Sequence, residues 1–177
     1  IDMINKVRSL TDKPFGVDLL LPSSIADTGN REDLEVEITE EHRRFVDQLK
    51  EEFSIPEPST PPNRPPLTKD YFKNQVGIIL DQKVPVFAAG LGNPGWMIPD
   101  AHAQGMKVIG LVGNVKNAKR VAAVDADAVV AQGTEAGGHT GRIGTLALVP
   151  QVVDAISPTK VVAAGGIGDG RGLVAAI

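Results

Sequence analysis

The sequence contains no cysteine, and this absence removes several kinds of chemistry at once. Without thiolates there is no cysteine nucleophile, no thiolate-ligated zinc and no iron–sulfur cluster. Aromatic residues are also scarce, with one Trp, one Tyr and five Phe among 177 residues, and no basic patch accompanies them. Nucleic acid is therefore not expected as a partner, because single strands are bound on aromatic platforms within basic grooves.

Long hydrophobic runs are absent too. No run approaches the roughly 20 residues that span a bilayer, and the first residues lack a signal-peptide pattern. The composition is that of an ordinary globular protein, with 42% hydrophobic and 23% charged residues. The sequence therefore predicts a soluble protein that does not act at a membrane, with the cytoplasm as the default location. The net charge of −4 is uneven, because residues 27–52 carry ten acids and four bases.

Five short segments are rich in β-branched and apolar residues and end in glycine or another small residue, as buried parallel strands do. They are residues 14–21, 84–90, 107–113, 128–133 and 160–166. Helical spacing occurs between the last four of them, at residues 98–104, 117–124 and 145–156. This alternation predicts βαβ units and a parallel sheet. Because ligands bind at the carboxyl ends of such strands, the terminal glycines mark the functional face.

A long connection runs from residue 22 to residue 83, between the first two expected strands. Residues 32–53 mix acids and bases around a few apolar positions and predict a charged, partly exposed helix, and residues 71–80 predict another. Between these helices, residues 56–66 hold six of the 13 prolines, which favours an extended spacer. The connection is interpreted either as an insertion that covers the ligand-binding face or as a solvent-exposed insertion without a functional role.

The densest functional signal is AQGTEAGGHTG, residues 131–141, directly after the fourth expected strand. Its glycines leave main-chain amides open to a ligand and present a single histidine, His139, at the strand end. Imidazole changes protonation near neutral pH, so His139 is the candidate general base. The alternative is that His139 caps the following helix or binds a backbone carbonyl. His42 and His102 lie on expected helices away from the strand ends, and no metal site is predicted from them.

A second glycine-rich segment, AAGGIGDGRG at residues 163–172, runs from the fifth expected strand into a helix. Open amides and the positive end of a helix dipole bind phosphate there, and Arg171 would add charge. The spacing matches neither the dinucleotide fingerprint nor the P-loop, so a nucleoside triphosphate is not expected. The alternative is a tight turn without a ligand. In a third segment, AAGLGNPGWM at residues 88–97, Trp96 would either cover a planar ring or pack in the core.

Taken together, these motifs resemble those of the nitronate monooxygenase family, flavin enzymes with a TIM-barrel fold. The resemblance covers PFGVDL from residue 14, PVFAAGLGNP from 85, VVAQGTEAGGHTG from 129, LVPQVVDAI from 148 and VVAAGGIGDGRG from 161. It implies the α/β class and a (β/α)8 barrel, with about five of the eight strands in this chain. Residues 1–177 would then be a single, incomplete barrel domain with the insertion at 22–83. A complete barrel needs about 250 residues, so two further strands are expected before residue 1 and one after residue 177.

The resemblance also implies bound FMN and the oxidation of nitronates or nitroalkanes by dioxygen, giving a carbonyl product and nitrite. The substrate would be of the propionate 3-nitronate or 2-nitropropane type, and a homo-oligomer is left open. His139 would remove the α-proton of a neutral nitroalkane. The residues assigned to the cofactor are Asp18, Gln132, Gly137, Gly138, Gly165, Gly166 and Gly168. Gly165 and Gly166 match the phosphate-binding turn, and Asp18 stands where many family members carry Asn.

Two alternatives remain open at this point. The flavin-dependent enoyl-acyl-carrier-protein reductase II is similar through the same AGGH and AAGGI motifs, and it would need a nicotinamide site and a channel for an acyl chain. The other alternative is a non-catalytic flavin-binding or truncated barrel fragment. The argument for this second alternative is that the sequence lacks two elements of the family. These are a Pro-Met pair in the first strand and a Gly-Thr-Arg phosphate-binding element after the last strand.

Overall fold

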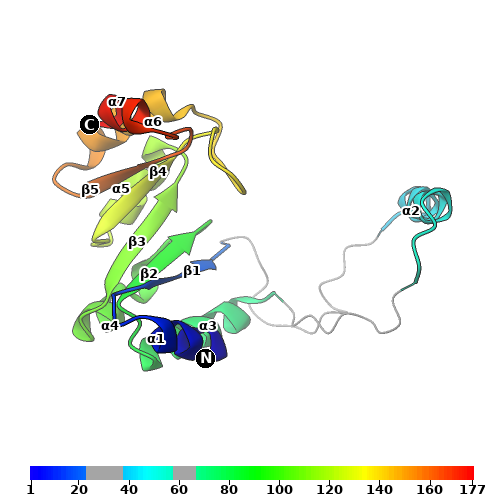
Figure 1. The fold of residues 1–177 in the computed structure, drawn as a ribbon, viewed down its shortest axis with the longest axis horizontal. Coiled ribbons are helices and arrows are strands. Elements are labelled where there is room, and N and C mark those ends of the chain that lie inside the picture. Colours follow the sequence, from blue (N-terminus) through cyan, green and yellow to red (C-terminus); the bar gives the residue numbers. More distant parts are fainter. Residues whose placement is uncertain (23–37, 58–66) are drawn as a thin grey trace. The chain divides into compact units, whose positions relative to one another are not determined.

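The computed structural model describes residues 1–22, 38–57 and 67–177. Its strands form one five-stranded parallel sheet in the order β1-β2-β3-β4-β5 (Figure 1). The strands are β1 (Gly16–Leu20), β2 (Val86–Gly90), β3 (Lys107–Val112), β4 (Ala128–Gln132) and β5 (Lys160–Ala164). Each lies within a segment that the sequence predicts as a strand. The expected parallel arrangement is therefore confirmed.

Helices connect the successive strands, as βαβ units require. They are α3 (Lys69–Asp81) before β2, η2 (Pro94–Trp96) and α4 (Ile98–Ala103) before β3, α5 (Val115–Ala122) before β4, α6 (Thr145–Ile156) before β5, and α7 (Gly170–Ala176) after it. Helix α5 begins two residues earlier than predicted because Asn114 caps it. The Oδ1 atom of Asn114 accepts a hydrogen bond of 2.8 Å from the backbone N–H of Asn117.

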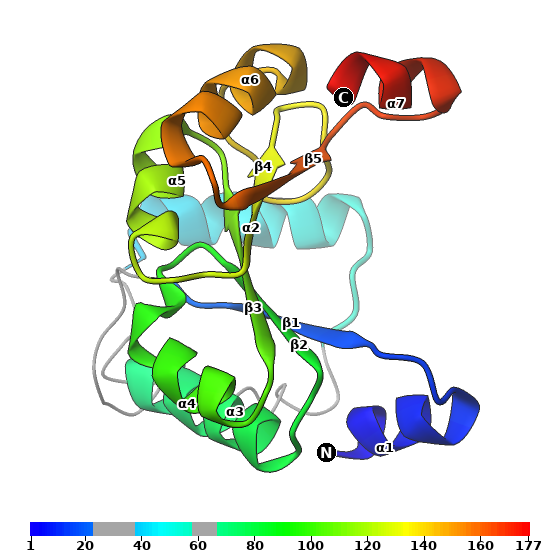
Figure 2. The same cartoon turned by 90° about the vertical axis from the view of Figure 1, so that its left-hand side faces the viewer.

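A helix that the sequence analysis did not predict, α1 (Asp2–Leu10), precedes the first strand. Its apolar residues Ile4, Val7 and Leu10 follow helical spacing, but only Ile4 is buried and no side chain caps the start of the helix. Helix α1 lies beside α3 at one side of the sheet in both views (Figures 1 and 2). The Arg8 guanidinium donates a hydrogen bond of 3.0 Å to the Oε1 atom of Gln82, just after α3. This contact attaches the N-terminal segment to the sheet unit.

One face of the sheet packs against helices α5 and α6 (Figure 2). Alternate strand residues such as Phe87, Val108 and Val129 are fully buried on this face. Helix α5 approaches β3 so closely that a Cβ on Gly110 would lie 2.4 Å from the Cγ1 atom of Val121. The small residue in the strand therefore sets the distance between helix and sheet, and with it the position of the residues at the start of α5.

The other face of the sheet is less covered. Asp18 and Leu20 of β1 lie on it, and Leu20 is aligned with Gly90 of β2. Leu20 is 42% exposed, and Val162 of β5 is 49% exposed. This face carries the side chains that point away from α5 and α6, and the cavity described below lies at the carboxyl ends of its strands.

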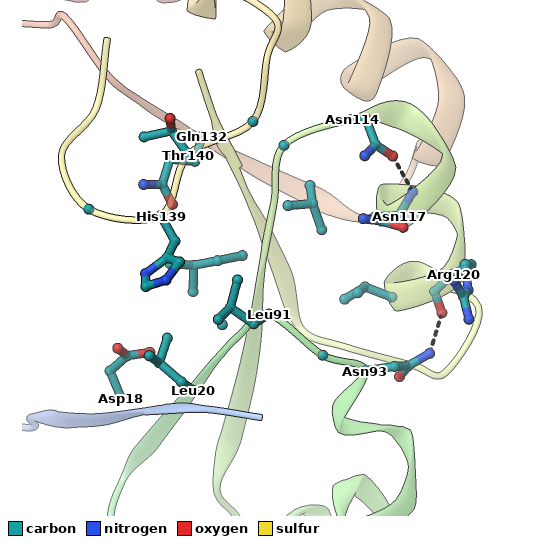
Figure 3. A pocket seen from close by; sticks show the side chains of 18 of the residues that line it. Asp18, Leu20, Leu91, Asn93, Asn114, Asn117, Arg120, Gln132, His139 and Thr140 are labelled. Atoms are coloured by element: carbon teal, nitrogen blue, oxygen red, sulfur yellow. Dashed lines mark hydrogen bonds between the residues drawn. The ribbon is translucent and has the colours of Figure 1, made fainter. Parts of the chain in front are cut away.

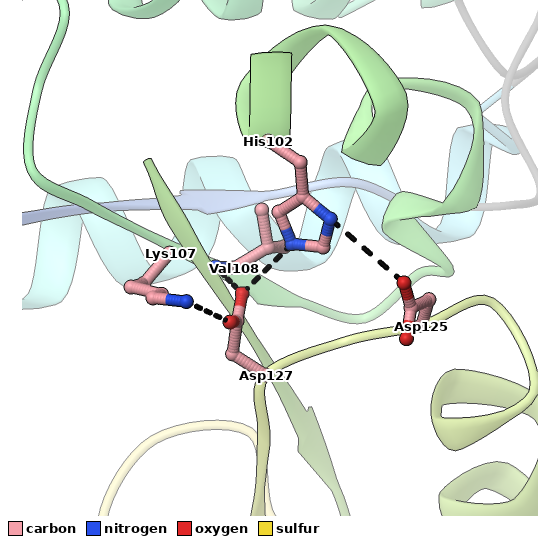
Figure 4. A network of polar contacts seen from close by, with 5 residues as sticks. All are labelled: His102, Lys107, Val108, Asp125 and Asp127. Atoms are coloured by element: carbon pink, nitrogen blue, oxygen red, sulfur yellow. Dashed lines mark hydrogen bonds and ion pairs between the residues drawn. The ribbon is translucent and has the colours of Figure 1, made fainter. Parts of the chain in front are cut away.

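A polar network lies at the opposite edge of the sheet, where β3 and β4 begin (Figure 4). The Asp127 carboxylate accepts hydrogen bonds from the Lys107 ammonium at 2.7 Å and the Val108 backbone N–H at 2.8 Å, and lies 2.9 Å from His102 Nε2. Burial opposes the ionisation of Asp127, but these contacts outweigh it and lower its pKa from 3.8 to about 2. His102 thus takes part in a structural network remote from the carboxyl ends of the strands, as the sequence predicts.

Replacing Asp127 by Asn is expected to lower the free energy of unfolding by about 2 kcal/mol at neutral pH. Because the folded pKa lies below that of the unfolded chain, the stabilisation is present above 3.8 and is lost as the pH falls toward 2. Urea unfolding measured from neutral pH down to about pH 2 should therefore show the two proteins converging at the acid end. Asp125→Asn is the control, because Asp125 is 94% exposed and 3.9 Å from His102 Nδ1. Equal losses in both variants would contradict the assignment.

The described residues 38–57 belong to a second unit of the chain. Its helix α2 (Glu40–Glu52) begins after Thr39, whose Oγ1 atom lies 2.7 Å from His42 Nδ1. None of the side chains of α2 is buried, in agreement with the charged, exposed helix that the sequence predicts. Residues 32–37 of that prediction and residues 58–66 of the proline-rich spacer lie outside the described residues. Within the described ranges, no helix has both the length and the apolar character that a bilayer span requires.

Candidate functional site

A cavity of about 560 Å³ opens at the carboxyl ends of β1 to β4 (Figure 3). Strand β1 contributes Asp18 and Leu20 to its wall, and the end of β2 with the turn after it contributes residues 90–93. The carboxyl ends of β3 and β4, the segments that follow them and helix α5 complete the lining. The volume lies within the range of roughly 300–1,000 Å³ that is usual for small-molecule sites. The cavity is therefore at the edge of the sheet where the sequence predicts ligand binding.

The loop from β4 to α6 carries His139 into this cavity (Figure 3). Within the described part of the chain, the imidazole has no hydrogen-bonding partner, and the residue that caps α6 is Gly144. The alternative of a capping histidine is therefore not what the structure shows. Gln132, at the end of β4, donates a hydrogen bond of 3.1 Å from Nε2 to the carbonyl of Gly137. Gly138 adopts a positive φ of 73°, which permits the turn that presents His139.

Glu135 anchors the same loop, and sequence analysis did not identify it. Its Oε2 atom accepts hydrogen bonds from the backbone N–H of Thr145 at 2.9 Å and from the Thr145 hydroxyl at 3.0 Å. These hydrogen bonds, that from the backbone first, lower the pKa of the Glu135 carboxyl. The carboxylate thus provides the acceptor for the first backbone N–H group of α6, and it does so from within the His139 loop. Its partner is ten residues away, beyond the reach of any local capping pattern.

Two glycines hold the loop against the end of β3. A Cβ on Gly141 would lie 2.5 Å from the carbonyl oxygen of Gly113, and a Cβ on Gly113 would lie 2.6 Å from the Cα atom of Gly141. Both neighbours are backbone atoms, which cannot turn aside as a flexible side chain would. The two chain segments therefore touch only because neither residue has a side chain.

Leu91, directly after β2, projects into the cavity beside Leu20 and His139 (Figure 3). Its backbone is left-handed, with φ of 60°, and its side chain is 46% exposed. The next residue, Gly92, passes so close to β1 that a Cβ would lie 1.8 Å from the carbonyl oxygen of Leu21. Left-handed backbone costs a non-glycine residue on the order of 1 kcal/mol. Such strain is typical of residues held for function.

We expect Leu91→Gly to be more stable than Leu91→Ala by about 1 kcal/mol, because glycine adopts a positive φ without penalty. Both variants lose every side-chain atom beyond Cβ, so the difference between them reports mainly the backbone. Thermal or urea unfolding of the two proteins measures it. Gly77→Ala serves as the reference, since Gly77 lies in α3 with no atom within 4 Å of a Cβ, and alanine should stabilise there. If alanine were also the more stable residue at 91, the backbone there would not be left-handed.

The glycines after β5 do not line this cavity. Gly165 and Gly166 both have positive φ, of 118° and 70°. A Cβ on Gly165 would lie 2.7 Å from the hydroxyl of Thr145, and one on Gly166 would lie 3.2 Å from the Cβ atom of Glu135. Gly168 has open space around it. The structure thus brings Asp18, Gln132, Gly137, Gly138 and His139 together in one cavity, and places Gly165 and Gly166, but not Gly168, next to the base of the His139 loop.

The charge of Arg171 is already paired. Its guanidinium donates a hydrogen bond of 2.6 Å to Oδ2 of Asp169 and is 93% exposed. Asp169 also accepts a hydrogen bond of 2.9 Å from the backbone N–H of Arg171 and so caps α7. This capping carboxylate competes with an anion for the start of the helix. The sequence analysis did not anticipate this pairing.

Sequence reasoning also missed the far wall of the cavity, which is formed by Asn93, Asn114, Asn117 and Arg120. The side-chain amide of Asn93 donates a hydrogen bond of 3.2 Å to the carbonyl of Arg120, which ties the turn after β2 to α5. Asn93 and Asn114 had a local signal, since each is an asparagine between a strand and a helix that caps the helix. Trp96 is 51% exposed and is not part of the lining, so it neither covers this cavity nor packs in the core.

A sequence model of one protein family, that of nitronate monooxygenase, matches residues 1–177. The chain belongs to the nitronate monooxygenase family. A protein assigned as a monooxygenase in Mycobacterium tuberculosis is 39% identical over 175 residues, which are 93% of this chain and 47% of that protein. One assigned as a nitronate monooxygenase in Staphylococcus aureus (strain Newman) is 34% identical over 188 residues, 99% of this chain and 49% of that protein. The chain thus spans about half the length of the curated relatives it matches.

Two solved structures share the fold of this family member. Nitroalkane oxidase from Streptomyces ansochromogenes superposes with a TM-score of 0.77 and 29% identity, over 98% of this chain and 50% of that one. A mutant of FabK from Thermotoga maritima superposes with a TM-score of 0.69 and 31% identity, over 99% of this chain and 43% of that one. Together with the parallel sheet, these similarities confirm the predicted fold class, part of a barrel of the (β/α)8 type.

Proposed function

We propose that this chain forms the reactive face of an FMN-dependent enzyme that oxidises nitroalkanes and nitronates with dioxygen, giving a carbonyl product and nitrite. The observation that carries the proposal is the position of His139, which reaches a cavity of ligand size with its imidazole unpartnered in the described chain. The family relationship supports the reaction class. The name of the nitroalkane oxidase that shares the fold points to the same class of substrate.

The residues that would hold the flavin are those that line the cavity with open backbone. Gly137 and Gly138 have no atom within 4 Å of a Cβ, so a flat ring can approach their main chain. The amide of Gln132 lies beside them and offers further polar atoms. For the phosphate, two left-handed glycines after β5 favour the proposed turn, whereas the carboxylate of Asp169 at the start of α7 opposes an anion there. The residues around the cavity therefore fit the flavin ring well, whereas the residues after β5 fit the flavin phosphate less well.

The chemistry that this chain supplies is proton removal. A neutral nitroalkane in the cavity would lose the proton on the carbon next to the nitro group to a ring nitrogen of His139. The electron pair of that C–H bond becomes the C=N bond of the nitronate, and the negative charge moves to the nitro oxygens. Bound flavin would supply the oxidation of this nitronate and the reaction with dioxygen. Leu91 and Leu20 border the space beside His139 with apolar surface, which suits an alkyl group.

The test is to purify the protein and to measure visible absorption after gel filtration, followed by dioxygen consumption and nitrite release with 2-nitropropane. A yellow protein that releases nitrite supports the proposal. A protein that retains no flavin would instead favour a non-catalytic barrel fragment.

The similarity to FabK favours a second candidate activity, and the chain covers 43% of the FabK structure. The activity would be reduction of an enoyl-acyl-carrier-protein substrate with a nicotinamide cofactor. Anaerobic addition of NADPH separates the two activities. Rapid bleaching of the flavin would support the reductase, and slow bleaching together with nitroalkane oxidation would support the nitronate monooxygenase activity.

A further inference from the structure

Leu91 lies in the turn after β2 and borders the cavity beside His139 (Figure 3). Leu20, on the neighbouring strand β1, lies next to it, and its Cδ2 atom would be 3.0 Å from a Cβ on Gly90. The lack of a side chain at Gly90 therefore leaves room for Leu20. Leu91 is 46% exposed and Leu20 is 42% exposed, so neither side chain is buried in the core. Together they form an apolar corner of the cavity wall next to the imidazole.

The backbone of this turn is held against β1 on both sides of Leu91. On one side, the carbonyl of Gly90 accepts a hydrogen bond of 2.7 Å from the backbone N–H of Leu21. On the other side, a Cβ on Gly92 would lie 1.8 Å from the carbonyl oxygen of Leu21. Because both neighbours of Leu91 are packed on the same residue of β1, a ligand that presses on Leu91 meets a backbone with little freedom to yield.

Leu91 is also an unusual residue for its backbone conformation. Its φ of 60° lies in the left-handed region, which glycine adopts without penalty and leucine rarely adopts. The residues on either side, Gly90 and Gly92, are glycines, yet the left-handed position is the one that carries the large side chain. Backbone strain of this kind is found where a side chain is needed at a functional site. The strain and the fixed turn therefore single out Leu91 within the apolar corner.

The position of the apolar corner determines which part of a substrate it contacts. Proton removal requires the α-carbon of a nitroalkane to come within reach of a ring nitrogen of His139. The alkyl groups on that carbon then lie close to the side chains that border His139, which include Leu91 and Leu20. In an apolar pocket, one methylene group changes kcat/KM by about tenfold or more. A wall that does not yield therefore discriminates between alkyl groups by their bulk.

We propose that Leu91 is a specificity-determining residue, which limits the bulk of the alkyl group on the carbon that His139 deprotonates. The cavity then accepts a compact secondary nitroalkane such as 2-nitropropane in preference to a bulky one such as nitrocyclohexane. This inference rests on the proposed function and names the alkyl groups that the site takes. Leu91 takes no part in proton transfer, which remains the task of His139.

The first test compares 2-nitropropane with nitrocyclohexane, which has the same reacting carbon and a larger alkyl group. Nitrocyclohexane exceeds 2-nitropropane by as many carbon atoms as Leu91→Ala removes from the wall. We expect Leu91→Ala to raise kcat/KM for nitrocyclohexane relative to that for 2-nitropropane about tenfold, mainly through a lower KM. Leu91→Phe enlarges the wall and should lower the same ratio. The measurement is dioxygen consumption over a range of concentrations of each substrate.

Leu146→Ala is the matched control for this comparison. It makes the same truncation in α6, at a position that is 72% exposed and outside the cavity lining. The ratio of the two kcat/KM values should therefore equal that of the wild type. Urea unfolding of each variant establishes that the proteins compared are folded.

The second test does not depend on turnover. Isobutyramide and cyclohexanecarboxamide keep the two alkyl groups and replace the nitro group by a neutral amide, and NMR titration of the purified protein measures the affinity for each. Relative to isobutyramide, Leu91→Ala should bind cyclohexanecarboxamide about tenfold more tightly than the wild type does. If the wild type oxidised neither nitro compound, the proposed function would fail, and this titration would still decide whether Leu91 selects by bulk.

Two results would overturn the inference while leaving the proposed function in place. In the first, both Leu91 variants keep the preference of the wild type in turnover and in binding. In the second, Leu91→Ala and Leu91→Phe change the preference in the same direction, which would mean that the substitutions disturb the turn and that the side chain sets no limit on bulk.

Discussion

Replacing His139 by Asn is expected to lower kcat/KM for a neutral nitroalkane by roughly 10²- to 10⁴-fold, the usual contribution of a general base. Asparagine keeps a polar side chain in the cavity but accepts no proton at neutral pH. Turnover of a preformed nitronate needs no proton removal, so it should fall far less. The measurement is dioxygen consumption with each substrate at saturating and limiting concentrations.

His42→Asn is the control for this comparison, because His42 lies on the exposed helix α2 and contacts Thr39. It should leave both activities unchanged. Equal loss on the nitroalkane and the nitronate in His139→Asn would mean that the imidazole positions the substrate or supports the flavin. No loss on either would show that the histidine takes no part in the reaction.

The largest expected effect on stability comes from Gly133→Ala, at the point where β4 passes into the His139 loop. The added methyl carbon would lie 2.1 Å from the hydroxyl oxygen and 2.4 Å from the backbone nitrogen of Thr145, which is buried. Neither the strand end nor the start of α6 can move without breaking the hydrogen bonds of Glu135 to Thr145. We expect a loss of about 3 kcal/mol in the free energy of unfolding, at the upper end for overpacking.

Gly137→Ala provides a control within the same loop. A Cβ at this position meets no atom within 4 Å, so the free energy of unfolding should change by less than about 1 kcal/mol. Urea unfolding of the three proteins side by side makes the comparison. Similar losses for both variants would indicate that the loop tolerates no side chain at all, and would contradict the specific role assigned to Gly133.

The strands could be predicted from the sequence because each is a short apolar run that ends in small residues, a pattern that depends only on neighbouring positions. Helix α6 could be predicted to the residue for the same reason. Helix α1 is not marked in the same way, because no side chain caps its start and it offers only a short apolar pattern at Ile4, Val7 and Leu10. The start of α5 was predicted two residues late because the capping side chain of Asn114 lies outside the apolar pattern.

The part of the candidate site that lies in one continuous segment of the chain could be predicted from the sequence. The His139 loop is continuous in the sequence, and the structure places its glycines and its histidine in one cavity. Contacts between distant segments were not predictable. Glu135 accepts a hydrogen bond from Thr145, which is ten residues later in the sequence. The Asn93 side chain donates one to the carbonyl of Arg120 in α5, which is 27 residues later. The open carboxylate of Asp18 could be named from the sequence, but its lack of a partner is visible only in the fold.

The contact between Gly113 and Gly141 has a consequence for protein engineering. Any library that randomises the cavity must keep both positions fixed, because every other residue would place a carbon within 2.6 Å of backbone on the opposite side. Between these fixed points, residues 137 and 138 have free space, although the positive φ of Gly138 restricts the choice there. Diversity introduced at Leu91, Thr140 and Asn117 would therefore reshape the substrate space without disturbing the junction on which the loop depends.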